Sequence, residues 1–287
     1  MLNRIVVAML VGAGALWSTP GAAAAPPVTT LTAQTFAGVW APEPRGPRKP
    51  GDARGPGLAP PPAGRFGGPP PGPPPGRGIT IGKEDQAKGL EAGDIHTRAL
   101  MTEAGKAKFA TYDPLMHPTS NCRSPGLPSI AQIPELQEWR INADGVTIRH
   151  ESYGAIRTAS FGQTTHPAGA HTLQGHAIAR LDGADLMIET ANLAAEWGGL
   201  GRAAPGSDQR VVREIYHLVD ADTIEGVIEI SDPLYLTQTL RMPVRLKRQP
   251  ADTQIVDFPC DVEVAQRDYQ YIRDGVANSR SSEGGVP

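Results

Sequence analysis

A series of short segments that alternate apolar and polar residues begins at residue 136, and it constrains the fold more than any other feature. Alternation with a period of two is typical of strands that bury one face. Turn residues separate the segments about every 8 to 12 positions, as in "NADG" at 142–145 and "LDGAD" at 181–185. The expected strands span residues 136–142, 145–152, 154–161, 173–181, 185–193, 210–219, 224–231, 237–248 and 253–259. Roughly nine consecutive strands with no long helix between them predict an antiparallel meander that closes as a barrel or folds as a sandwich.

The segments that flank this series predict one more strand and two helices. The run "TFAGVWA" at 35–41 has the apolar and aromatic residues of a strand. One helix, ended by Pro114, is predicted before the strands by the near-helical spacing of Leu100, Ala104, Ala107 and Phe109. Another, with a frayed tail, is predicted near the C-terminus by the spacing of Val264, Tyr271 and Val276. We expect residues 86–287 to form a single, mainly β domain.

The first 24 residues have the order of an export signal, with Arg4, an apolar run from Ile5 to Trp17 and then small residues up to Pro26. The run is shorter than the roughly 20 residues that span a bilayer, so we expect a cleaved signal peptide rather than a permanent anchor. No cysteine lies near the expected cut, so a lipid anchor is not expected. The mature protein is expected to be soluble and either periplasmic or secreted.

Residues 25–40 contain the first strand region, and residues 41–85 are expected to form a disordered insert. The most biased part of this insert, 41–78, is dominated by Pro and Gly and has almost no large apolar side chains. Such a segment cannot bury enough surface to offset its ordering entropy. An alternative is that the insert is a Pro-rich ligand for an aromatic groove on a partner in the cell envelope.

Charge and cysteine content narrow the functional classes. The net charge is −3, and the Lys and Arg residues are scattered along the chain, so nucleic-acid binding is disfavoured. The two cysteines, Cys122 and Cys260, predict one disulfide in an oxidising compartment. Two unpaired buried thiols are the alternative.

Several short motifs lie along the chain: Gly38-x-Trp40, "TYDP" at 111–114, "NCRSPGLP" at 121–128, Glu151 with Arg157, "HP" at 166–167, "GHAIARLDGADLMIET" at 175–190 and "PCDVE" at 259–263. Together these motifs resemble those of a family of uncharacterised secreted bacterial proteins. The longest corresponds to a family segment of the form Gly-His-Ser-x-Gly-Arg-Trp-x-Gly-Asp-Thr-Leu-Val-Val-x-Thr. This chain departs from it at Ala177, where the family has Ser, and at 179–181, where the family has Gly-Arg-Trp. The Gly-x-Trp motif is also similar to that of lipocalins and related calycin barrels, which favours a barrel over a sandwich.

The candidate site residues are polar side chains within the predicted strands. The sequence contains no phosphate-binding loop, Gly-x-Ser-x-Gly elbow or His-Glu-x-x-His motif. Arg157 shares a face with Phe161, and a buried Arg needs a carboxylate partner, for which Glu151 and Glu189 are the candidates. His217 shares a face with Val211, Arg213, Ile215 and Val219.

These residues predict a small hydrophobic ligand inside the barrel, with Glu151, Arg157, Glu189 and His217 at its polar end. His176 and Arg180, in the longest family-like segment, are further ligand-binding candidates. The main alternative is a cofactor-independent lyase, isomerase or cyclase that acts on a small apolar or aromatic substrate, with Glu151 or His217 as general base beside Arg157. Spacings of five residues between His166, His171 and His176 are not those of zinc motifs, so we expect neither a metal nor a cofactor.

Overall fold

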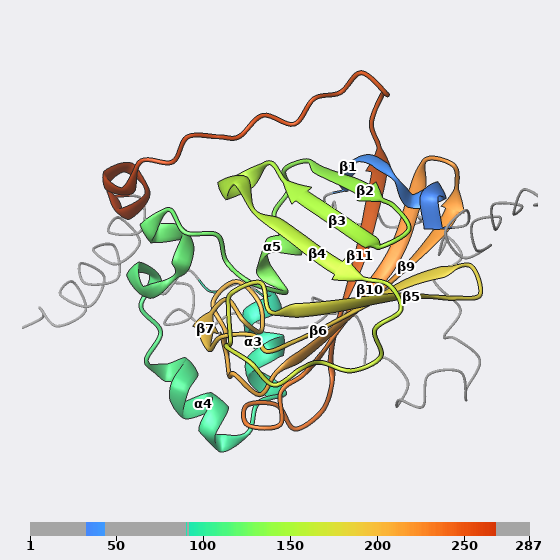
Figure 1. The fold of residues 1–287 in the computed structure, drawn as a ribbon. Helices are drawn as coiled ribbons and strands as arrows, with labels where there is room; N and C mark the ends of the chain where they lie inside the picture. The colour runs from blue at the N-terminus through green and yellow to red at the C-terminus, as the bar shows by residue number, and fades with distance from the viewer. Residues whose placement is uncertain (1–32, 44–89, 91, 268–287) are drawn as a thin grey trace, which may run out of the picture.

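The computed structural model describes residues 33–43, 90 and 92–267, and nine of its strands form a closed barrel (Figure 1). Around the barrel the strand order is β1-β11-β10-β9-β6-β5-β4-β3-β2. The strands are β1 (Gly38–Pro42), β2 (Gln137–Ile141), β3 (Gly145–His150), β4 (Ile156–Ser160), β5 (His176–Asp182), β6 (Asp185–Ala191), β9 (Val211–Asp220), β10 (Thr223–Ser231) and β11 (Leu240–Arg248). The predicted mainly β barrel is therefore confirmed, while the expected signal peptide and nearly all of the Pro/Gly-rich insert lie outside the described residues.

One pair of neighbouring strands breaks the predicted antiparallel pattern. β4 and β5 are parallel and share only two register pairs, Ala159 with Ala177 and Ser160 with Ile178. By contrast, β10 and β11 pair antiparallel from Thr223 to Ile230. A parallel pair cannot be joined by a tight hairpin, and residues 161–175 instead form a long connection between β4 and β5. Of the neighbouring strand pairs in the barrel, β4 and β5 thus have the fewest register pairs.

The Gly-x-Trp motif closes the barrel, because β1 pairs with both β2 and β11. The Trp40 side chain is fully buried, its indole N–H donates to Phe36 O at 2.9 Å, and the Arg248 guanidinium lies 4.2 Å from its ring centroid. Gly38 has a φ of +142°, and a Cβ at this position would overlap the Arg248 side chain. Only glycine fits this arrangement without strain.

Large apolar side chains fill the interior of the barrel. Trp139 is one of them, and its ring centroid lies 6.5 Å from that of Trp40 and 4.8 Å from that of Tyr216. The other buried members of this interior cluster are Phe36, Val146, Ile148, Ala159, Ala179, Leu186, Ile188, Ile224 and Leu246. The barrel is therefore a packed core rather than a wide, open lumen.

A second apolar cluster lies between the sheet and the helices α3 (Ala92–Ala99), α4 (Glu103–Ala110) and α5 (Ser129–Gln132). The short strands β7 (Glu196–Trp197) and β8 (Pro205–Gly206) form a separate two-stranded sheet, and Figure 1 shows β7 on the same side of the molecule as α3 and α4. Where one helix was predicted, the chain forms two. Thr102 has extended backbone angles and its side chain accepts from Gly105 N, so it caps α4 and separates it from α3. Short 3₁₀ turns lie at Gln34–Phe36, Pro114–Met116, Pro118–Asn121 and Ser152–Gly154.

The prediction of a strand at 253–259 is wrong. This described segment leaves β11 and runs outside the sheet (Figure 1), with Val256 and Phe258 exposed. Its apolar residues have the composition of a strand. However, β11 already lies between β1 and β10 in the closed barrel, so it has no free edge with which this segment could pair. The predicted disulfide joins Cys122 to Cys260, with Cα atoms 5.6 Å apart. A helix follows at 262–267, and the rest of the expected C-terminal helix lies outside the described residues. Among the described helices, none has the length and apolar character needed to cross a bilayer.

Candidate functional site

Four polar side chains meet inside the barrel, and strand alternation places each of them there. Arg157 comes from β4, His150 from β3, and Glu214 and Tyr216 from the inner face of β9. Arg157 forms a bidentate ion pair with Glu214, in which Nη1 donates to Oε2 at 2.7 Å and Nη2 donates to Oε1 at 3.1 Å. The Tyr216 hydroxyl donates to Glu214 Oε1 at 2.6 Å, and Arg157 Nε donates to His150 Nε2 at 3.2 Å. We call these four residues the interior polar cluster.

The protonation states of the cluster follow from burial and from the ion pair. Burial acts to lower the pKa of Arg157, but the charge and hydrogen bonds of Glu214 outweigh it and hold that pKa above its ordinary value. Burial, followed by the charge of Glu214, raises the pKa of Tyr216 well above its usual range. Burial, followed by the charge of Arg157, lowers the pKa of His150 well below its usual range. Tyr216 and His150 are therefore neutral, and the only charges in the cluster are those of the Arg157–Glu214 pair.

A narrow slot adjoins the interior polar cluster where β4 and β5 separate. Its volume is about 10 Å³, which is about the room of one water molecule. The slot is lined by Arg157 and Thr158 of β4, by Gln174 of the connection 161–175, by Thr190 of β6 and by the apolar residues Val146, Ile148, Ala159, Ala177 and Ile188. Thr158 is exposed on the outer face of β4, whereas Arg157 and Ile148 are buried, so the slot leads from the surface to the interior.

Within the part of the chain that the structure describes, two buried polar atoms without a hydrogen-bond partner belong to residues of this slot. They are the hydroxyl oxygen of Thr190, a residue with 0 % exposure, and Oε1 of Gln174. Buried polar atoms in proteins are nearly always bonded to protein or to water. The slot is therefore a place where the fold provides hydrogen-bonding groups that the protein itself does not use.

The structure places the predicted site residues differently from the expectation. Arg157 points inward, as predicted, but its partner is Glu214 rather than Glu151 or Glu189. Glu151 is buried at the end of β3, where its side chain accepts from Leu136 N at 3.1 Å and from Val256 N at 3.3 Å. It thus holds backbone segments together and does not reach the interior polar cluster through any described hydrogen bond.

The prediction that Glu189 and His217 point into the barrel is wrong. The inner face of β9 carries Glu214 and Tyr216, so His217 lies on the outer face, where its Nδ1 is 2.6 Å from Asp185 Oδ1. Glu189 also faces outward and accepts from Arg213 Nη2 at 2.7 Å. Both faces of β9 mix apolar and charged residues, and period-two alternation separates the faces without showing which one is buried.

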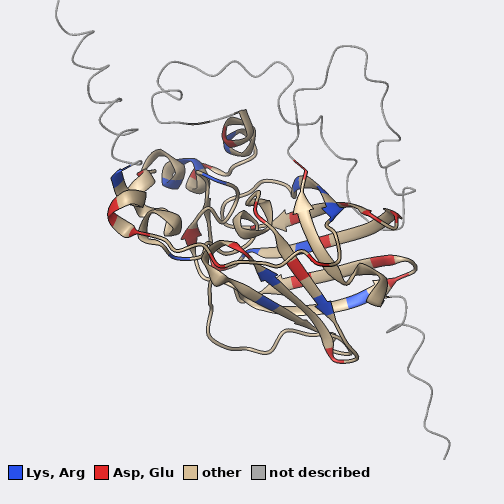
Figure 2. Cartoon of the chain, turned by 90° about the horizontal axis from the view of Figure 1, so that it is seen from above, with Lys and Arg blue, Asp and Glu red and all other residues tan. Residues whose placement is uncertain are grey.

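The remaining ligand-binding candidates also lie outside the barrel. Arg180 is exposed on β5. His176 Nδ1 is 2.9 Å from His166 Nδ1, while His171 Nδ1 is 3.2 Å from Leu193 O, so the three histidines do not converge. Within the part of the chain that the structure describes, no three His, Cys, Asp or Glu side chains form a group that could hold a metal ion. Figure 2 shows Lys and Arg interspersed with Asp and Glu over the strands.

Sequence reasoning missed Glu214, Tyr216, Thr190 and Gln174. Only Glu214 had a usable signal, since it shares a face with Val212 and Tyr216, and a charged residue between two large apolar ones within a strand is a candidate for burial. The position of Gln174 depends on where a long irregular connection runs, which no local pattern encodes.

A second buried ion pair also escaped prediction and lies away from the slot. Arg210 and Glu196 are almost fully buried, with Nη2 and Oε1 2.8 Å apart. Arg210 also donates to the backbone oxygens of Leu127, Ala194 and Ser207. Because the guanidinium bonds so many backbone groups, this pair holds irregular segments together and is best understood as structural.

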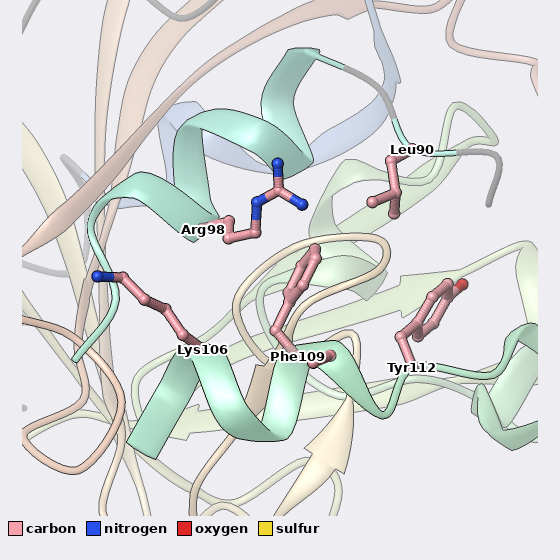
Figure 3. Close-up of a pocket in the computed structure, with 6 residues that line it drawn as sticks. Leu90, Arg98, Lys106, Phe109 and Tyr112 are labelled. Carbon is pink, nitrogen blue, oxygen red and sulfur yellow. The ribbon is translucent and has the colours of Figure 1, made fainter. Parts of the chain in front are cut away.

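A larger cavity, of about 100 Å³, lies outside the barrel between α3 and α4 (Figure 3). Its lining residues are Leu90, Arg98, Lys106, Phe109, Ala110 and Tyr112. The Arg98 guanidinium lies 5.7 Å from the centroid of the Phe109 ring, and Lys106 forms an ion pair with Glu103 at 2.8 Å. The charged groups that line this cavity are thus both cationic, and the Tyr112 hydroxyl is its other polar side-chain group.

Comparison with known proteins adds no family assignment. The chain matches no protein-family profile, and neither a curated protein nor a solved structure is significantly similar to it.

Proposed function

We propose that this protein is a barrel-type binding protein for a small, largely apolar molecule, whose polar end enters the slot between β4 and β5. The observation that carries the proposal is the pair of unpartnered polar atoms, Thr190 Oγ1 and Gln174 Oε1, in a slot with otherwise mainly apolar walls. Ligand sites in proteins commonly combine apolar walls with a few convergent polar groups. The enclosed end of the ligand would also contact the apolar slot residues Val146, Ile148 and Ala177.

The interior of the barrel limits what can bind. Because Trp40, Trp139 and Tyr216 are fully buried in the packed core, an extended ligand cannot lie along the barrel axis as it would in a wide lumen. The site is therefore a slot in the wall. The short parallel pairing of β4 with β5 favours this position, because fewer backbone hydrogen bonds oppose a local separation of these two strands.

The interior polar cluster favours binding over catalysis. A general base needs a lone pair that can reach substrate. Glu214 is fully buried and both its oxygens accept from Arg157, while His150 Nε2 accepts from Arg157 Nε. A compensated pair of this kind positions neighbouring groups and leaves none of its members available for proton abstraction, which disfavours a lyase, isomerase or cyclase mechanism at this cluster.

The disulfide supports action in an oxidising compartment, so we place the protein in the periplasm or outside the cell. The mainly apolar walls of the slot support a small molecule as partner rather than a nucleic acid.

Native mass spectrometry of the full chain, purified under non-denaturing conditions from the cells that make it, tests the proposal. The wild type should carry one small molecule that denaturing extraction releases. Thr158→Trp should lose this molecule, because the indole covers the mouth of the slot. Ile156→Trp should retain it, because Ile156 is exposed on the same strand but does not line the slot. An empty wild type, or equal occupancy in the two variants, would count against the proposal.

A further inference from the structure

We infer that the group bound in the slot is neutral and both donates and accepts hydrogen bonds, as an alcohol hydroxyl does, and is neither a carboxylate nor an amine. This inference rests on the proposed function and specifies the chemistry of its ligand. It follows from three features of the slot: the fixed orientation of Gln174, the unused hydroxyl of Thr190 and the balanced charge of the Arg157–Glu214 pair.

Gln174 presents an acceptor to the slot. Its amide Nε2 donates to Ser124 Oγ and to Pro125 O, each at 3.2 Å. The Pro125 carbonyl can only accept, so the amide nitrogen must face it and the amide oxygen must lie on the other side. That oxygen is the buried Oε1, which accepts from no group among the described residues and is available to a donor of the ligand.

Thr190 supplies a group that can either donate or accept. Its hydroxyl is buried on β6, and the Thr190 side chain has no exposed surface. A single ligand hydroxyl satisfies both residues, because it can donate to Gln174 Oε1 and accept from the Thr190 hydroxyl. A carboxylate has no proton to give to Gln174. An ammonium could donate to both residues, so its charge, rather than its hydrogen bonding, excludes it.

The charge balance leads to the same conclusion. Arg157 lines the slot, but its charge is already matched by Glu214 at 2.7 Å, and the neighbouring His150 is neutral. A charged ligand would therefore bring an uncompensated charge into a largely apolar site, where burial strongly disfavours it. We expect a charged analogue to bind at least about tenfold more weakly than the neutral one, which corresponds to about 1.4 kcal/mol.

The size of the slot sets how much of the ligand is enclosed. A volume of about 10 Å³ accepts one group of the size of water. The hydroxyl is therefore the enclosed part, and the carbon chain extends toward the mouth at Thr158. A primary alcohol with a short chain has this shape.

Methyl NMR of the full chain with three probes of equal length, 1-butanol, butanoate and butylammonium, tests the inference. We expect 1-butanol to shift the methyl signals of Thr190, Ala177 and Ile148 saturably, and the two ions to bind at least about tenfold more weakly. Thr190→Val replaces the hydroxyl by a methyl group of similar size and should fold normally, because the hydroxyl has no hydrogen-bond partner among the described residues. It should weaken 1-butanol binding severalfold, whereas Thr147→Val, on the outer face of β3, should not.

The possible results separate the inference from the proposed function. If butanoate or butylammonium binds at the same methyls as tightly as 1-butanol, the inference of a neutral group is wrong while binding in the slot stands. If Thr190→Val and Thr147→Val bind 1-butanol equally, the role of the Thr190 hydroxyl is wrong. If none of the probes shifts the slot methyls, both the inference and the proposed function are overturned.

Discussion

Replacing Glu214 by leucine should destabilise the barrel far more than the same replacement of Glu189. Both carboxylates lie on neighbouring strands of the barrel, Glu214 on β9 and Glu189 on β6, and both bind an arginine at 2.7 Å. They differ in solvent exposure, because the side chains of Glu214 and Arg157 are 0 % and 6 % exposed, while those of Glu189 and Arg213 are 22 % and 38 % exposed. Burial is therefore the main difference between the two ion pairs.

The expected magnitudes follow from what each replacement leaves behind. Glu214→Leu leaves the Arg157 guanidinium buried without a counter-charge and removes the acceptor of the Tyr216 hydroxyl. Breaking a buried pair in this way typically costs about 3–5 kcal/mol. Glu189→Leu leaves Arg213 in contact with water, and an exposed pair contributes about 0–1 kcal/mol. The free energies of unfolding should therefore differ by at least about 2 kcal/mol between the two variants.

Urea unfolding of the disulfide-bonded chain, followed by tryptophan fluorescence, measures both values from the midpoints and slopes. The double variant Arg157→Met/Glu214→Leu provides a further check, because it removes both charges and should be more stable than Glu214→Leu alone. Equal destabilisation by Glu214→Leu and Glu189→Leu would refute the assignment of the Arg157–Glu214 pair to the barrel interior.

Three further predictions concern the rest of the fold. Cys122→Ser/Cys260→Ser opens a closed loop with a sequence separation of 138 residues and should lower the free energy of unfolding by up to about 5 kcal/mol; a Tm equal to that of the wild type would contradict the disulfide. Thr102→Ala removes the cap of α4 and should cost about 1 kcal/mol in urea unfolding, whereas the exposed Thr111→Ala should cost less. Burial, followed by the charge of Arg202, lowers the pKa of His117 to about 4, so the unfolded state binds the proton more tightly and stability falls as the pH drops below about 6.5. Between pH 7 and pH 5, the free energy of unfolding of His117→Gln should fall by about 2 kcal/mol less than that of the wild type. Burial raises the pKa of Glu196 to about 7, so Glu196 also contributes to the pH dependence, and the test of His117 is the difference between the wild-type and variant profiles. Identical profiles would refute its role.

The sequence predicts the strands well because each one buries one face and the period-two pattern records this directly. Eight of the nine strands expected from residue 136 onward correspond to barrel strands, and "TFAGVWA" contains most of β1. The error at 253–259 arises because an exposed segment that runs outside the sheet has the apolar residues of a strand. The split between α3 and α4 was missed because the apolar spacing continues across Thr102, while the capping side chain ends the helix.

The candidate site was predicted less completely, for a different physical reason. Arg157 could be placed inside because it shares a face with Ala155 and Ala159, which are buried. Its partner could not be identified, because β4 and β9 do not pair with each other and Glu214 meets Arg157 only across the closed barrel. The slot depends on where β4 and β5 diverge and on the path of residues 161–175, which are properties of the tertiary structure.

A crystal structure of the protein soaked in 1-butanol would test the central claim most directly. The account predicts electron density for the alcohol in the slot, with its oxygen within hydrogen-bonding distance of both Thr190 Oγ1 and Gln174 Oε1 and its carbon chain directed toward Thr158. A slot closed by protein atoms, with the Thr190 hydroxyl and the Gln174 amide oxygen bonded to other protein groups, would contradict it.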